Sequence, residues 1–122
     1  TLAGIKSKTD GGSGYNEFVM DDTCDHEKIR MHAQMDMEGK IENDEKRDVG
    51  NVYSLEAGTV KPTGKIELKI GQSSIVMDAM SITIKSQTIK IEAGILLDET
   101  SPVTKVNGDA TLILKGGVVL IN

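Results

Sequence analysis

Aromatic residues are almost missing from this chain. Its 122 residues include two Tyr, one Phe and no Trp. A globular core draws much of its buried area from aromatic side chains, so the Ile, Val, Leu and Met that remain suit a narrow interior with little room for rings. The same scarcity disfavours a nucleic-acid or sugar-binding surface, because such surfaces stack their ligands on aromatic platforms.

Cysteine, positive charge and long apolar runs are also scarce. Cys24 is the single cysteine, so the chain forms no internal disulfide. Residues 1–60 hold 13 acidic and 7 basic side chains, and residues 61–122 hold 6 and 7, for a net charge of −5. No basic stripe is present to attract nucleic acid. No apolar run approaches the roughly 20 residues that a membrane-crossing helix needs.

What the chain does have is a short sequence pattern, or phrase, that recurs along its second half. Aliphatic and polar residues alternate strictly over residues 65–70, 81–85, 88–92 and 111–115, and glycines or small polar residues separate these phrases. Alternation of this kind places aliphatic side chains on one face of a β-strand. The phrases mostly start seven to nine residues apart, which leaves no room for helices between them. The pattern therefore predicts a stack of short strands with no helices.

The aliphatic positions change parity from phrase to phrase, which keeps every phrase aimed at the same side of the stack. The side chains predicted to face inward are Ile66, Leu68, Ile70, Ile75, Met77, Ile82, Ile84, Ile89, Ile91, Leu112 and Leu114. One copy of such a stack leaves a whole apolar face uncovered. We therefore expect several copies to close that face together.

The first half of the chain is less regular. Residues 15–20 and 27–33 are predicted to form a hairpin of two strands around an acidic turn, preceded by a glycine-rich, irregular lead-in over residues 1–14. Residues 34–48 contain a charged run with helical propensity, but no apolar stripe of period 3.6, so strand and loop are preferred there.

Candidate metal ligands gather in the acidic turn. His26 follows Asp21, Asp22, Cys24 and Asp25, but their spacing matches no closed zinc pattern. We predict no metal site and no cofactor.

Signatures of catalysis are equally weak. The carboxylate pairs of residues 21–22 and 44–45 are interpreted as solvated turn residues, and His32 is predicted to lie on the outer, polar face. No nucleophile elbow or phosphate-binding loop occurs. We expect the chain not to be an enzyme.

Five segments of the first half carry a resemblance to a known family. Residues 4–7, 16–22, 29–37, 42–44 and 49–51 occur in an order that resembles the conserved stretch of VgrG, the valine-glycine repeat spike protein of type VI secretion systems. Residues 69–75 and 110–117 also resemble the ends of VgrG needles. One departure is that residues 52–64 lack the Val-Gly spacing of the family.

The resemblance implies a homotrimeric, intertwined triple-stranded β-helix, a prism-shaped needle. The expected organisation is a lead-in and needle start over residues 1–51, a connector over residues 52–64 and needle repeats over residues 65–122. The implied function is structural: a membrane-puncturing, effector-delivering spike, secreted through the type VI system.

The implied partners are two further copies of the chain, an Hcp-like tube, effectors and, transiently, a target-cell membrane. A PAAR-repeat tip protein is expected on the apolar end of the chain. The residues expected to bind it are Val118, Val119, Leu120, Ile121 and Asn122. The alternative function is a phage tail-spike or adhesin-like fibre that binds a cell surface.

Overall fold

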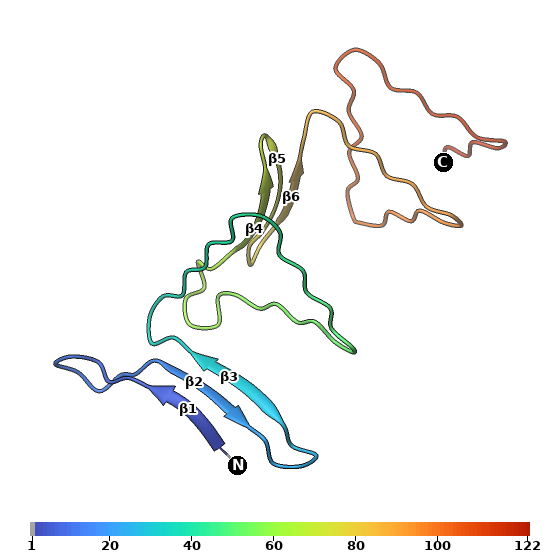
Figure 1. Cartoon of the computed structure of the whole chain (residues 1–122). Coiled ribbons are helices and arrows are strands. Elements are labelled where there is room, and N and C mark those ends of the chain that lie inside the picture. The colour runs from blue at the N-terminus through green and yellow to red at the C-terminus, as the bar shows by residue number, and fades with distance from the viewer. Residues whose placement is uncertain (1) are drawn as a thin grey trace. The chain divides into compact units, whose positions relative to one another are not determined.

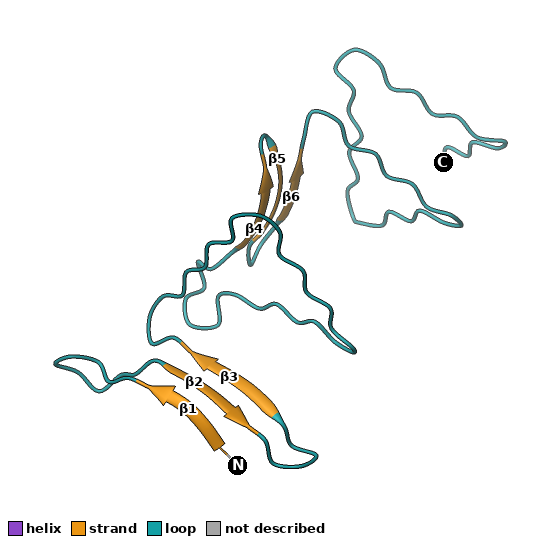
Figure 2. Cartoon of the chain, in the orientation of Figure 1, coloured by secondary structure: helices purple, strands orange, loops and turns teal. Residues whose placement is uncertain are grey.

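The computed structural model describes residues 2–122, and these residues form strands, turns and extended loops without any helix (Figure 2). The all-β prediction is confirmed. The chain divides into two compact units, one ending at Tyr53 and the other comprising Ser54–Asn122. Each unit contains one three-stranded antiparallel sheet with its strands in sequence order (Figure 1). No helix in the described chain could span a bilayer.

The first sheet is formed by β1 (Leu2–Lys6), β2 (Glu17–Asp21) and β3 (Lys28–His32). β2 and β3 are the predicted hairpin. The lead-in is less irregular than predicted, because β1 pairs with β2 over its whole length. The glycine-rich composition of residues 1–14 hid this strand. Much of that glycine belongs to the β1–β2 connection, where the Thr9 amide donates to the Gly14 carbonyl.

The second sheet is formed by β4 (Ile66–Ile70), β5 (Ser73–Met77) and β6 (Ile82–Lys85). A two-residue turn joins β4 to β5, and its first residue, Gly71, has a φ of +54°, which favours glycine. Between β5 and β6 the Asp78 carboxylate accepts hydrogen bonds from the amides of Met80 and Ser81, each at 2.8 Å. These amides lower the pKa of Asp78, which stabilises the turn in its ionised form.

Outside the sheets the chain bends at regular intervals. Bends fall at residues 34–35, 42–43, 50–51 and 59–60, and again at residues 94–95, 102–103, 109–110 and 117–118. The intervals of seven to nine residues are those at which the aliphatic-polar phrases repeat. Gly50, Gly94 and Gly117 occupy bend positions. Glycines that separate segments of the sequence therefore lie at bends of the chain.

Outside the two sheets, the segments between these bends have no strand partner among residues 2–122. Residues 88–92 and 111–115 were predicted as strands, but they belong to neither sheet (Figure 2). No backbone–backbone hydrogen bond joins two parts of the described chain between residues 86 and 122. A strand exists only where its amides and carbonyls meet a partner. The alternation is present in these segments, but no partner strand lies beside them among the described residues.

The connector contains one close backbone approach that can be tested. A Cβ added to Gly64 would overlap the Cα of Gly58, and Gly58 itself has a φ of +81°. We expect Gly64→Ala to destabilise the folded protein by more than about 1 kcal/mol, measured by denaturant unfolding. The control is Gly39→Ala, because a Cβ at Gly39 meets no atom within 4 Å. Equal stability of the two variants would contradict the close approach.

Candidate trimer interface

The strand register collects the apolar side chains of the first sheet on one side. This surface, the first apolar face, consists of Ala3, Ile5, Phe18, Met20, Ile29 and Met31. Phe18 lies between Ile5 and Met31, and Met20 lies between Ala3 and Ile29. All of these side chains are exposed in the single chain. The sequence showed that Ile29 and Met31 share a face, but it did not place the whole cluster in the predicted core.

The opposite side of the first sheet is polar and better covered. Arg30 Nη2 donates to Glu17 Oε1 at 2.8 Å, and the Glu17 side chain is only 12% exposed. His32 stacks on Tyr15 with ring centroids 4.3 Å apart, and Lys6 Nζ lies 4.3 Å from the Tyr15 centroid. His32 therefore lies on the polar face, as its place in the alternation predicts, although it is half-buried.

In the middle strand of each sheet the polar side is more buried than the apolar side, which is the reverse of what a soluble monomer shows. Along β2 the residues of the polar side, Glu17, Val19 and Asp21, are half-buried, whereas Phe18 and Met20 on the apolar side are 40% and 41% exposed. Along β5, Ser74 and Val76 of the polar side are half-buried while the apolar side is exposed. A sheet covered only on its polar side still has its apolar side to bury.

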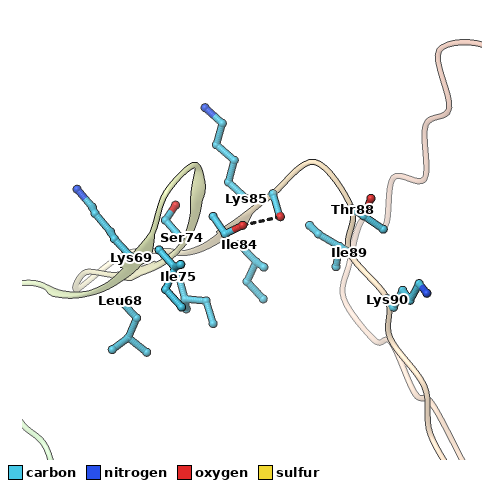
Figure 3. A pocket seen from close by; sticks show the side chains of 12 residues that line it. Leu68, Lys69, Ser74, Ile75, Ile84, Lys85, Thr88, Ile89 and Lys90 are labelled. Atoms are coloured by element: carbon cyan, nitrogen blue, oxygen red, sulfur yellow. Dashed lines mark hydrogen bonds between the residues drawn. The ribbon is translucent and has the colours of Figure 1, made fainter. Parts of the chain in front are cut away.

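The second sheet gathers seven of the residues predicted to face inward. This second apolar face consists of Ile66, Leu68, Ile70, Ile75, Met77, Ile82 and Ile84. In Figure 3 Leu68, Ile75 and Ile84 point to one side of the sheet, and Lys69 and Lys85 point to the other.

The four other predicted inward residues lie outside the strands. Ile89 lines an open hollow of about 370 Å³ together with Leu68, Ile70, Ile75 and Ile84. Ile91, Leu112 and Leu114 follow in the extended segments, and each is more than half exposed. The structure thus groups eight of the eleven predicted residues, and the role of the set as a trimer core stays a prediction.

Exposure of the whole chain points to the same need for a partner. None of the described residues is buried, and the accessible surface is 12,672 Å². A folded monomer of 13.1 kDa exposes about 6,400 Å². This chain therefore leaves about twice the expected area in contact with water. The described part of a single copy has no hydrophobic core, and the area left to bury lies on its apolar faces.

The other candidate residues stand alone. Val118, Val119, Leu120 and Ile121 are each at least half exposed, and Asn122 is exposed as well. Their role in binding a tip protein stays a prediction. Within residues 2–122 no three His, Cys, Asp or Glu side chains are grouped so that they could hold a metal ion. Cys24 is exposed and unpaired.

The ion pair on the first sheet gives a pH dependence that can be measured. The hydrogen bond from Arg30 lowers the pKa of Glu17 in the folded state. The pair therefore stabilises the fold above the ordinary Glu pKa of about 4.3, and this contribution is lost as the pH falls through the lowered value. We expect the melting temperature of Glu17→Gln to fall less between about pH 5 and pH 3 than that of wild type. Asp78, whose pKa is also lowered, keeps part of the acid dependence in the variant.

A matched control for this experiment is Glu42→Gln. Glu42 pairs with Lys40 at 3.0 Å, but both side chains are more than 80% exposed, so solvent weakens their interaction. The control should keep the acid dependence of wild type. If Glu17→Gln keeps it as well, the Arg30–Glu17 pair does not contribute to acid sensitivity.

Comparison with known proteins agrees with this picture of exposed, partner-dependent faces. The model of a family described as the bacteriophage T4 gp5 C-terminal trimerisation domain matches residues 3–111. The chain is also 42% identical over 41 residues to the actin cross-linking toxin VgrG1 of Vibrio cholerae serotype O1. That match covers 34% of this chain and only 4% of the toxin's length.

These matches confirm the resemblance to the C-terminal region of a VgrG-like spike. They support a spike-like structural role and self-association as a homotrimer. The family match begins at residue 3, so it includes the first sheet except for Leu2 as well as the whole second sheet. Over nearly its whole length, the chain belongs to the family of the bacteriophage T4 gp5 C-terminal trimerisation domain.

Proposed function

We propose that three copies of this chain wind into an intertwined triple-stranded β-helix that serves as the needle of a type VI secretion spike. The observation that carries the proposal is the combination of uncovered apolar faces with unpaired, regularly bent backbone. Residues 86–122 hold their amides and carbonyls in extended segments without backbone partners among the described residues. Two neighbouring copies would supply both the hydrogen-bond partners of this backbone and the surfaces that cover the apolar faces.

The work of such a needle is mechanical. Many inter-chain hydrogen bonds and one continuous aliphatic interior would make it rigid enough to be driven through a target-cell membrane. No side chain needs to perform chemistry, so the needle itself is not an enzyme and needs no cofactor. The needle would travel from the bacterial cytoplasm to the outside through the secretion system, with an Hcp-like tube behind it and effectors as cargo.

The first test is the mass of the purified full chain by light scattering. We expect three chains of 13.1 kDa, about 39 kDa. A chain that stays folded at the mass of one copy in dilute buffer would overturn the proposal, because one copy cannot cover its own apolar faces.

The second test addresses the tip of the needle. The last residues, Val118–Asn122, combine apolar side chains on both faces with high exposure, so they are suited to being covered by a PAAR-repeat tip protein. Replacing Leu120 and Ile121 together by Ser should abolish co-purification with such a protein while the trimer mass is kept. Retained binding would place the tip protein elsewhere.

A further inference from the structure

Two serines interrupt the second apolar face. Ser73 lies two residues before Ile75, and Ser86 lies two residues after Ile84, so both share the side of the sheet that the aliphatic residues occupy. Ile75 pairs with Ile84 across the β5–β6 ladder, which places the two serines opposite each other at its end. Their Oγ atoms are 2.7 Å apart, and Figure 3 draws this hydrogen bond.

Aliphatic side chains surround the pair on its own side of the sheet. Ser73 and Ser86 line the same open hollow as Leu68, Ile70 and Ile89. In the single chain Ser73 is exposed and Ser86 is half-buried, so water reaches both hydroxyls. If a neighbouring copy covers the hollow, that water is lost. Each hydroxyl must then find a protein partner, because an unpaired buried hydroxyl is costly.

The pair satisfies only part of this requirement. One hydroxyl donates to the other, and the accepting hydroxyl keeps its own hydrogen without an acceptor among residues 2–122. Three copies around a common axis bring three such pairs to the same level. The remaining hydrogens can then bond from one copy to the next, which closes a ring of hydroxyls.

Resting on the trimer proposed above, we infer that Ser73 and Ser86 form a polar layer inside the interface that fixes the axial register of the three chains. The aliphatic pattern repeats every seven to nine residues, so a chain displaced by one repeat would still place aliphatic residues against aliphatic residues. The hydroxyl layer distinguishes the correct alignment, because a displaced chain leaves hydroxyls facing Ile or Leu.

The position of the layer suits this role. Ser86 follows β6 directly, and after it the chain has no internal backbone partner through residue 122. The alignment of the three chains at Ser86 therefore determines which amides meet which carbonyls in everything that follows.

A double-mutant cycle tests whether the pair is buried. Ser73→Ala, Ser86→Ala and the double variant are melted as full chains at one protein concentration. Each single variant leaves a buried hydroxyl unpaired and should lower the melting temperature by about 5 °C or more. The double variant removes both hydroxyls and should melt within about 2 °C of wild type. Additive losses would overturn the inference, since a solvated pair shows no such coupling.

Hydrogen exchange of residues 86–122 tests the register itself. Wild type should give one isotopic envelope per peptide, whereas the double-alanine variant should give two, because displaced trimers leave overhanging segments that exchange quickly. Ser74→Ala, on the opposite side of β5, is the control and should behave as wild type. A single envelope in the double variant overturns the register role.

The mass of wild type separates this inference from the proposed function. A wild-type mass of one chain overturns the trimer, and the polar layer with it. A trimeric wild type with an additive cycle overturns the polar layer alone.

Discussion

Replacing Ile84 by Asp is expected to abolish trimer formation. Ile84 lies in β6 opposite Ile75 of the middle strand, within the second apolar face. In the proposed needle the new carboxylate would appear three times near one axis without a partner, at a cost of roughly 3–5 kcal/mol per chain. Light scattering should therefore find mainly single chains of 13.1 kDa, with loss of the cooperative melting transition.

The control for this experiment is the neighbouring residue. Thr83→Asp introduces the same charge one position earlier in β6, on the side of the sheet that carries Lys85. It should assemble and melt nearly as wild type does. If Ile84→Asp also assembles and melts like wild type, the aliphatic side of the second sheet does not face the trimer interior.

The second sheet could be predicted from the sequence because its information is local. Alternation at Ile66, Leu68 and Ile70 specifies which side chains share a face before any partner strand is known. Register then brings Ile75 and Ile84 onto the same face. The separating glycines at residues 94 and 117 coincide with bends for the same reason, since a bend depends on the few residues that form it.

What the sequence could not supply is the identity of each strand's partner. Residues 88–92 alternate as clearly as residues 81–85 do. Within the described chain, however, only residues 82–85 belong to a sheet. Pairing depends on what lies alongside, and in an assembly of three copies that can be another chain. β1 is the converse case, a strand that has a partner but little alternation. Only its pairing with β2 reveals it as a strand.

The second large effect is expected from a substitution in the first apolar face. Phe18 lies at the centre of β2, between Ile5 and Met31, and it is 40% exposed in the single chain. The family match includes this sheet from residue 3 onward, so we expect self-association to bury this face as well. Phe18→Asp should then lower amide protection in β1, β2 and β3 at least about 100-fold, since breaking such an interface costs roughly 3 kcal/mol.

The mass of the Phe18→Asp variant should nevertheless remain that of a trimer. The second unit, Ser54–Asn122, keeps its own apolar face and its own bent segments, so its association does not require the first sheet. Val19→Asp is the matched control, because it places the same charge one position along β2, on the polar side of the sheet opposite Arg30. Full protection of the first sheet in Phe18→Asp would show that its apolar face stays in water, and the trimer interface would then be confined to the second unit.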